Sequence, residues 1–381
     1  MQSLDPGSVK LLRRVANPRK DDAEIVEAVT GIRTWKQAID AAREHGVIPA
    51  LQARLAVSPA HIPADALRLV KAEFERNAFH CMTNAEELLE VLQAFDQVGI
   101  PAIPFKGVVL AASAYGDLTA RAAGDIDLLI HPNDLPKATQ ILEARNYELI
   151  TAKLEDGSPR YVHQYEHHFE RESDGMVLEL RWRLELTQPR YRENLGLDWV
   201  WSRQRTAKLL GAEVPDLDPV SNLLVLCMHG SKHAWSRLIW ICDVARLLER
   251  EPELDWNLAQ REARRVGLWR CLALGVLLAH RVAGAEVPRE VLHKFEANRA
   301  MRNLAQFLDD NLLAGSGSLP ARRIPYYVRI LDFRDRLRAV LSPSLLQPNE
   351  RDRSVVRLPK MLEPLYFLIR PFRLLVDRTG R

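Results

Sequence analysis

The feature that most limits how this chain can fold is a change of hydrophobic period near its middle. Between residues 100 and 182, short runs alternate polar and apolar side chains, whereas the flanking segments repeat apolar residues every three or four positions. Short alternation predicts β-strands and the longer period predicts helices. We therefore expect the α+β class, a mixed α/β fold with a small sheet embedded between helical N- and C-terminal regions. The predicted strands are residues 100–105, 125–130, 147–151, 166–171 and 176–182.

The segments on both sides of the sheet are predicted to be helical. Residues 64–79 have the helical period, and a separate helix is expected to begin at a capping box formed by Thr83 and Glu86 and to end at Gly99. Beyond residue 198 the pattern is helical again. The other predicted helices are residues 34–45, 219–233, 238–249, 257–266, 272–282 and 324–341.

The sequence pattern suggests four parts. They are a helical region at residues 1–99, an α/β core at 100–186, a helical domain at 187–341 and a basic amphipathic tail at 342–381. From residue 351 the tail carries eight basic and three acidic residues. Its apolar residues recur at helical spacing, which favours packing on the helical domain over contact with RNA or with an anionic membrane surface.

Composition excludes several classes of protein. Among 381 residues, 53 are Lys or Arg and 50 are Asp or Glu, and this net charge of +3 argues against a chain-wide binder of polyanions. The four cysteines form no C-x-x-C pair, which excludes a zinc ribbon or a thioredoxin-type site and favours free thiols. With no apolar leader and no transmembrane segment in view, we expect a soluble cytoplasmic protein.

The strongest chemical signal is the run D-I-D-L-L-I at residues 125–130. In a strand, Asp125 and Asp127 share one face, and the neighbouring isoleucine and leucine side chains point to the other. Two carboxylates on one face repel each other, and a divalent cation such as Mg²⁺ removes that repulsion. The plainer alternative is that both aspartates begin a strand at a solvated edge.

A third carboxylate strengthens the metal interpretation. Within residues 176–182, Glu179 lies on the face opposite an apolar stripe and shares that face with Arg181. Beside the aspartate strand, Glu179 would complete a cluster able to hold two Mg²⁺ ions next to a nucleoside triphosphate. An exposed glutamate on a half-solvated strand is the alternative.

Cationic residues nearby are candidates for binding phosphate. Lys106 and Gly107 stand where a strand ends and a helix begins, Arg121 precedes the aspartate strand, and Gly124 adjoins it. A glycine permits close approach of a phosphate group and a lysine adds a point charge. Solvated loop charges are the alternative, and the Walker A pattern is absent.

These residues resemble a known family. The runs F-K-G-V-V-L at 105–110 and G-D-I-D-L-L at 124–129 resemble bacterial nucleotidyltransferase-family proteins of the DNA polymerase β superfamily, and the resemblance extends over about residues 35–373. It implies a small polymerase-β-like sheet. It also implies that Asp125, Asp127 and Glu179 are the metal-binding acids and that Lys106 and Gly107 form the phosphate turn.

The sequence departs from that family at two places. The phosphate turn is Lys-Gly where the superfamily more often has Gly-Gly or Gly-Ser. Arg181 stands where relatives often have histidine, which puts in doubt any base or substrate role of that position. We interpret Arg181 as a further contact to phosphate.

Weaker signals lie in the helices after the sheet. His229 and His233 have the i, i+4 spacing of a zinc pair, but Gly230 replaces the glutamate that such a motif needs. We expect His229, Lys232 and Asp243 to line a cleft between the helical domain and the sheet, with Lys232 near the nucleotide. Asp243 lies in an apolar helix and needs a partner, for which Lys232 is the nearest candidate. A purely structural pair stays an alternative.

The function that we expect is Mg²⁺-dependent transfer of a nucleoside monophosphate from ATP or another NTP to an acceptor hydroxyl, with release of pyrophosphate. The alternative is a non-catalytic nucleotide-binding module that acts as a sensor or as a partner in a biosynthetic or toxin–antitoxin pair. The sequence leaves the acceptor open among a small molecule, a peptide, a protein and a tRNA.

Overall fold

A computed structural model of the chain describes residues 4–17, 22–56, 61–150, 166–183 and 197–313, together with Tyr326, Ile330 and Tyr366. Apart from those three tyrosine and isoleucine positions, the helix predicted at 324–341 and the tail at 342–381 lie outside the described residues. All described residues up to Ile330 belong to one compact unit, and Tyr366 belongs to a second. Two of the predicted domain boundaries, after residue 99 and after residue 186, fall within the span of the first unit, and they stay predictions.

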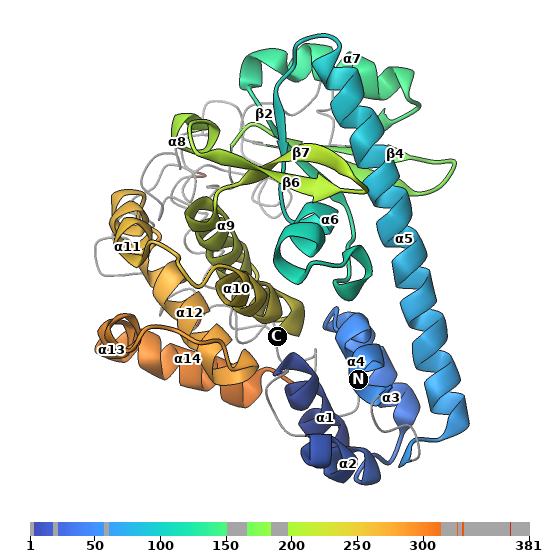
Figure 1. Cartoon of the computed structure of the whole chain (residues 1–381), viewed down its shortest axis with the longest axis vertical. Helices are drawn as coiled ribbons and strands as arrows, with labels where there is room; N and C mark the ends of the chain where they lie inside the picture. The colour runs from blue at the N-terminus through green and yellow to red at the C-terminus, as the bar shows by residue number, and fades with distance from the viewer. Residues whose placement is uncertain are drawn as a thin grey trace. The chain divides into compact units, whose positions relative to one another are not determined.

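The sheet confirms the α+β class (Figure 1). Its five strands lie in the order β1-β2-β5-β4-β3, and every neighbouring pair is antiparallel except β2 and β5, which are parallel. The strand β1 lies at one edge of the sheet, contains Pro104 and directly follows Pro101. Proline lacks a backbone N–H donor, and an edge strand tolerates that loss. The strands are β1 (Ala102–Pro104), β2 (Ile126–Ile130), β3 (Glu148–Leu149), β4 (Glu166–Arg171) and β5 (Met176–Arg181).

Helices cover the sheet because alternate side chains of its central strands are aliphatic. All five residues of β2 (Ile126–Ile130) are buried, and the three on its apolar face, Ile126, Leu128 and Ile130, share a core cluster. That cluster includes Leu88 and Phe95 of α5 (Ala64–Asp96) and Leu142 of α7 (Leu135–Ala144). Short helical segments connect β1, β2 and α7. They are α6 (Gly107–Leu110), the π-helical η2 (Ala111–Tyr115) and the 3-10 helices η3 (Leu118–Ala120) and η4 (Pro132–Asp134).

The helix α5 corrects one prediction. It runs unbroken for 33 residues, from contacts with α3 and α4 to the sheet, so the capping box expected at Thr83 does not begin a helix (Figure 1). The Thr83 hydroxyl instead donates a hydrogen bond to the carbonyl of Phe79, one turn back. With no glycine or proline in this stretch, nothing interrupts the backbone ladder. The predicted end is confirmed, since Gly99 follows the helix with φ +73°.

A hairpin was missed by the sequence analysis, which predicted only helices beyond residue 198. Strands β6 (Gln204–Leu209) and β7 (Ala212–Leu217) are joined by a two-residue turn of Leu210 and Gly211, with φ +50° and +86°. Positive φ at both positions is typical of a type I′ turn, and a leucine there conceals it from a search for Asn-Gly or Gly-Gly. The hairpin packs beside β1, and Leu209 and Val214 join the core of the larger sheet.

Two further groups of helices complete the described part of this unit. Among the later helices, α9, α10 and α12 pack on one another closely enough that a side chain at Gly275 would lie 2.5 Å from the Cys227 sulfur. Together with α11, these helices confirm the four helical segments predicted between residues 219 and 282. The later group is α8 (Leu197–Trp201), α9 (Pro219–Lys232), α10 (Leu238–Arg250), α11 (Trp256–Arg265), α12 (Trp269–Ala283), α13 (Arg289–Glu296) and α14 (Arg299–Asn311). The N-terminal group is α1 (Pro6–Ala16), α2 (Asp22–Thr30), α3 (Trp35–Glu44) and α4 (Ile48–Leu55).

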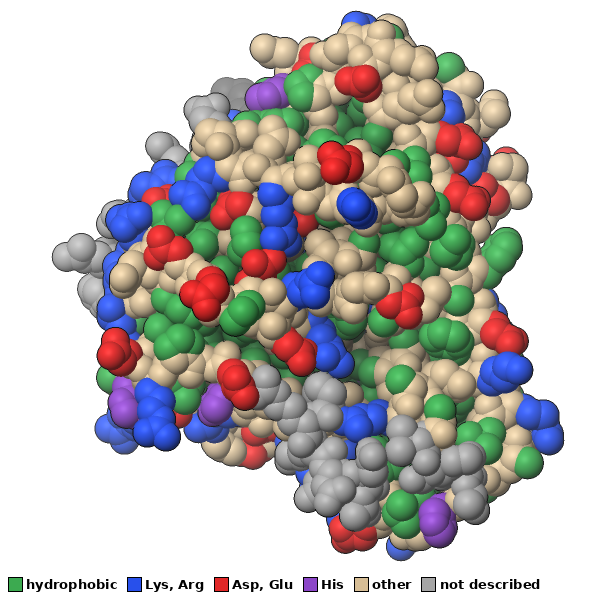
Figure 2. Space-filling model, viewed as in Figure 1, with side chains coloured by type: hydrophobic (Ala, Val, Ile, Leu, Met, Phe, Trp, Pro, Cys, Tyr) green, Lys and Arg blue, Asp and Glu red, His purple; other side chains and the backbone are tan. Residues whose placement is uncertain are grey.

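The surface and the thiols agree with the composition. On the face seen in Figure 2, Lys and Arg side chains are interspersed with Asp and Glu and do not gather in one basic patch. All four cysteines are free. Among the described helices, none combines the length and the apolar character needed to cross a membrane.

Candidate active site

Three carboxylates converge at one end of the central strands. Asp127 in β2 lies directly opposite Glu179 in the neighbouring β5, and Asp125 immediately precedes β2. Ligand oxygens of these three residues, hereafter the acid cluster, lie within 4.8 Å of one another. Asp127 and Glu179 are only 5% and 7% exposed, whereas Asp125 is half-buried. The structure thus brings together the three acids singled out from the sequence.

The turn after β1 brings a lysine to this cluster. Lys106 has the backbone angles φ 59° and ψ −143°, a conformation that strains a residue with a side chain. Its ammonium nitrogen lies 3.2 Å from Oδ1 and 3.1 Å from Oδ2 of Asp127. Gly107 follows with φ +45°, and a Cβ there would lie 3.3 Å from the Asp125 carbonyl oxygen. A glycine is therefore needed for the close approach of this turn to the aspartate strand.

Arg181 reaches the same acids from β5. Two residues beyond Glu179, it lies on the same face of the strand, and its guanidinium pairs with the Glu179 carboxylate. Its Nε lies 3.2 Å from Asp127 Oδ1, and its Nη1 lies 2.6 Å from Glu166 Oε2. Only 6% of Arg181 is exposed, so these ion pairs are largely shielded from water.

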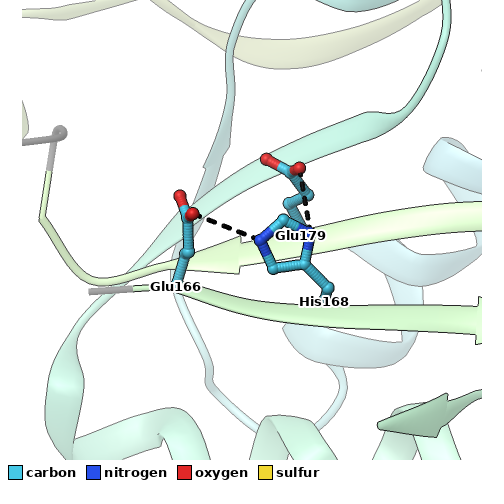
Figure 3. Close-up of side chains that lie close together, drawn as sticks. All are labelled: Glu166, His168 and Glu179. Carbon is cyan, nitrogen blue, oxygen red and sulfur yellow. Dashed lines mark ion pairs between the residues drawn. The ribbon is translucent and has the colours of Figure 1, made fainter. Parts of the chain in front are cut away.

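The next strand adds two residues that the sequence analysis did not select. His168 of β4 lies opposite Glu179, with its Nδ1 3.2 Å from Glu179 Oε1 and its Nε2 3.2 Å from Glu166 Oε1 (Figure 3). Glu166, His168 and Glu179 form a second group whose spacing could hold a metal ion. The alternation of side chains along β4 puts Glu166 and His168 on one face, and this pattern could have suggested both residues from the sequence. It does not reveal the register of β4 against β5, which puts His168 opposite Glu179.

Burial and charge shift the pKa values of the site in opposite directions. Burial, followed by the repulsion of Asp127, raises the pKa of Glu179 to about 7. For Asp127, burial also opposes ionisation, but Lys106 and Arg181 together lower its pKa. Burial acts the same way on Glu166, but the hydrogen bond from His168 and the charge of Arg181 lower the pKa of Glu166 to about 2. Below about pH 7, Glu179 in the metal-free site is therefore mostly protonated.

The last turn of α9 faces this charged region. Burial, reinforced by the positive charge of Lys106, lowers the pKa of His229 well below its usual value, so the ring is neutral. Its ring centroid lies 4.7 Å from that of His233 and 5.5 Å from that of Trp240. Burial also lowers the pKa of Lys232, against the attraction of Glu166. The predicted proximity of His229 and Lys232 to the acids is consistent with these interactions.

Asp243 corrects the prediction of its partner. Its carboxylate accepts hydrogen bonds from Arg121 at 2.7 and 2.9 Å and from the Tyr115 hydroxyl at 2.8 Å. The partner is therefore Arg121 and not Lys232. Arg121 and Asp243 are 122 residues apart in the sequence, so local spacing could not reveal this pair. Asp243 is 1% exposed, and its place beside a cleft stays a prediction. We refer to Tyr115, Arg121 and Asp243 as the paired cluster.

Arg121 has a structural use that the sequence did not reveal. Its remaining nitrogen, Nη1, donates to the carbonyls of Ala122 at 3.1 Å and Gly107 at 3.4 Å. All three guanidinium nitrogens are thus engaged within the protein, and the side chain ties the Lys106–Gly107 turn to α10. The triphosphate contact expected of Arg121 stays a prediction, and the present geometry assigns it a positioning role instead.

The helix α5 fixes the loop that leads into the acid cluster. The carbonyl of Gly124 accepts hydrogen bonds from Asn84 at 2.6 Å and from the His80 ring at 2.9 Å. One turn earlier, Asn77 donates to the carbonyls of Thr119 and Arg121. Gly124, predicted to bind phosphate, is therefore held through its backbone, and the phosphate contact stays a prediction.

His167 points away from the acids. It alternates with His168 along β4, is 2% exposed, and packs edge-on against Trp182 and Phe169 with ring centroids 5.0 and 6.1 Å away. His167 therefore packs in the core.

Comparison with known proteins identifies the family. A family model described as "uncharacterised nucleotidyltransferase" matches residues 33–284. The chain belongs to this family. The predicted resemblance to nucleotidyltransferases is confirmed, and with it the expectation that the protein is an enzyme of that class. None of the curated proteins matches this nucleotidyltransferase.

Three solved structures show some similarity to this chain, each at low sequence identity and low TM-score. The lincosamide antibiotic adenylyltransferase LnuA, bound to lincomycin, is 15% identical over 36% of this chain and 83% of its own, with a TM-score of 0.27. The antibiotic-resistance factor ANT(2'')-Ia is 13% identical over 60% of this chain and 97% of its own, with a TM-score of 0.29. An antigenic nucleotidyltransferase-like protein from Paracoccidioides brasiliensis is 20% identical over 48% of this chain and 87% of its own, with a TM-score of 0.31.

Proposed function

We propose that this nucleotidyltransferase moves a nucleoside monophosphate from an NTP, such as ATP, to an acceptor hydroxyl in a Mg²⁺-dependent reaction that releases pyrophosphate. The observation that carries the proposal is the acid cluster, in which three carboxylates from two adjacent strands approach within 4.8 Å. Such a set of hard oxygen donors suits Mg²⁺. Like charges held this close and this far from water call for a cation of high charge.

Asp125, Asp127 and Glu179 would hold Mg²⁺, and two ions are expected. Bound there, the metal polarises the α-phosphate and lowers the pKa of the attacking hydroxyl. The phosphoryl centre needs no covalent help from the protein, so the other residues have only to orient and neutralise the triphosphate.

The cations around the acid cluster supply that neutralisation. Lys106 and Arg181 already lie within 3.2 Å of Asp127, and Lys232 interacts with Glu166 from α9. We propose that these three side chains bind the triphosphate. At Gly107 the absence of a side chain leaves room for a phosphate beside the turn.

The experiment is a transfer assay with a matched pair of variants. Labelled NTPs are incubated with Mg²⁺ and with acceptor mixtures of hydroxyl-bearing small molecules, peptides and tRNA, and pyrophosphate release is measured. Asp127→Asn removes one acid of the cluster and should lower the rate by about 10³-fold or more, because charge stabilisation by a metal contributes several kcal/mol. Its circular dichroism spectrum should remain that of the wild type.

The control is Asp174→Asn, in the turn between β4 and β5. Asp174 also accepts hydrogen bonds from an arginine, Arg171, at 2.9 Å, but it belongs to neither group of metal-binding geometry. Transfer should be unchanged in this variant. A wild-type rate in Asp127→Asn would refute the proposal, and Mg²⁺-dependent NTP binding with no transfer to any acceptor would favour the sensor alternative.

A further inference from the structure

The carboxylate oxygens of two acid-cluster residues already have partners. Oδ1 of Asp127 lies 3.2 Å from both Lys106 Nζ and Arg181 Nε, and Oδ2 lies 3.1 Å from Lys106 Nζ. Oε2 of Glu179 accepts from Arg181, and Oε1 lies 3.2 Å from His168 Nδ1. Every ligand oxygen of these two acids thus faces a nitrogen.

Arg181 is the most extensive of these partners. Its guanidinium contacts three carboxylates at once, those of Asp127, Glu179 and Glu166, from within the protein. By contrast, Asp125 makes no hydrogen bond or ion pair with any residue in the described part of the chain. One acid of the cluster is therefore open to an entering ion, and the other two are covered.

A divalent ion at these oxygens competes with the two cationic side chains. Metal–oxygen ligation requires a distance of about 2.1 Å for Mg²⁺, closer than the nitrogens now lie, and the positive charges would repel each other strongly at that range. A guanidinium keeps its proton at any pH at which the protein is folded, so deprotonation cannot relieve the repulsion. The entering metal therefore weakens both ion pairs, and a buried cation that leaves a carboxylate needs another anion.

We propose that Arg181 and Lys106 are internal substitutes for the metal, which leave Asp127 and Glu179 for the triphosphate when a metal–nucleotide complex enters. This inference rests on the proposed function. The triphosphate is the anion that compensates the two displaced cations, so the nucleotide opens the metal site as it fills it. Metal and nucleotide therefore bind with strong positive coupling, and the metal alone binds weakly.

The test measures metal binding rather than activity. Binding of Mn²⁺, as a probe for Mg²⁺, is followed by isothermal titration calorimetry with and without an α,β-methylene NTP analogue that cannot be turned over. In the wild type, the analogue should strengthen Mn²⁺ binding by about tenfold or more. Arg181→Met, which keeps the length of the side chain without its charge, should bind Mn²⁺ alone about tenfold more tightly than the wild type and show weaker coupling.

The matched control is Arg171→Met in β4. Arg171 also pairs with two carboxylates, those of Glu87 and Asp174, but away from the acid cluster. Its Mn²⁺ binding and coupling should equal those of the wild type. Lys106→Met provides a second variant at the cluster, with the same expected direction, in case Arg181→Met does not fold.

Two outcomes would overturn the inference in distinguishable ways. If Asp127→Asn loses Mn²⁺ binding but Arg181→Met and Lys106→Met bind the ion no more tightly than the wild type, the substitution of metal by these cations is wrong and the metal site stands. If Asp127→Asn binds Mn²⁺ as well as the wild type does, the metal site itself is wrong, and the proposed function fails with it.

Discussion

Arg121 and Asp127 lie close together in the sequence, yet they belong to groups of buried charges of different kinds. The paired cluster joins one guanidinium to one carboxylate by two hydrogen bonds, with the Tyr115 hydroxyl as a third donor. In the acid cluster, three carboxylates meet, and Glu166 lies beside them. Lys106 and Arg181 are the cations that directly contact Asp127.

The difference lies in charge balance and not in burial. Arg121, Asp127 and Asp243 are each less than one-tenth exposed. The paired cluster satisfies its charges internally, as a buried ion pair must if it only supports the fold. In the acid cluster several carboxyl groups crowd together, and repulsion from Asp127 adds to burial in raising the pKa of Glu179. Buried carboxyl groups that repel one another are thus the better indicator of function.

The largest expected effect comes from breaking the balanced pair. Asp243→Ala leaves the Arg121 guanidinium buried without its counter-ion, so we expect the free energy of unfolding to fall by about 3–5 kcal/mol. Chemical denaturation monitored by circular dichroism measures this loss. Asp127→Asn keeps an amide oxygen that can accept from Lys106, and Arg181 keeps its pairs with Glu166 and Glu179, so stability should fall less.

A double variant tests whether the paired cluster is purely structural. In Arg121→Met/Asp243→Leu no charge is left, so the loss of stability should be smaller than in Asp243→Ala, at about 1 kcal/mol for each hydrogen bond lost by the Tyr115 hydroxyl and by the carbonyls of Gly107 and Ala122. Nucleotide affinity should fall by no more than about tenfold, because the Lys106–Gly107 turn loses its tie to α10 but keeps its cationic side chain. A stable double variant that has lost NTP binding would instead restore the triphosphate contact first predicted for Arg121.

The acid cluster was predictable because its signals are local. The alternation of side chains in β2 and β5 is written in a few consecutive residues, so Asp125, Asp127 and Glu179 could be assigned to faces without knowledge of the fold. The same reasoning predicted all five strands of the sheet. The metal geometry then followed from β2 and β5 being neighbours, which the family resemblance implied.

The remaining features depend on contacts between distant segments. No local pattern shows that Arg121 meets Asp243 or that β4 pairs with β5 in the register that puts His168 opposite Glu179. Local chemistry also misled at Thr83, where a good capping sequence lies inside a helix stabilised by packing. At Leu210 a turn conformation is imposed on a residue that does not favour it.

A smaller effect separates the two clusters by pH. The pKa of Glu179 is raised from 4.5 to about 7, so below pH 7 an entering metal has to displace a proton. The affinity for Mn²⁺ should therefore rise by about tenfold per pH unit up to about pH 7 and then level off. Calorimetry in buffers of different ionisation enthalpy should detect release of about one proton at pH 6.

The paired cluster should not share this dependence. Although burial opposes it, Asp243 raises the pKa of Arg121, so that guanidinium stays charged throughout the same range. Glu179→Gln is the control, because it removes the titrating group and should flatten the profile. If the metal affinity of the wild type were constant between pH 5 and 7, the binding of metal would not displace a proton from Glu179, and this prediction would be wrong.

The smallest expected effect tests whether α5 supports the two clusters unequally. Asn84 donates a 2.6 Å hydrogen bond to the carbonyl that precedes Asp125, whereas Asn77 holds the Arg121 carbonyl at 3.5 Å. Asn84→Ala should lower stability by about 1 kcal/mol and kcat by about fivefold, because the loop loses a fixed anchor beside a metal ligand. Asn77→Ala, the matched control on the same helix, should leave kcat unchanged, since the paired cluster is held by its own ion pair. Equal losses of kcat in both variants would mean that α5 positions the whole loop as one body, and that the acid cluster has no anchor of its own.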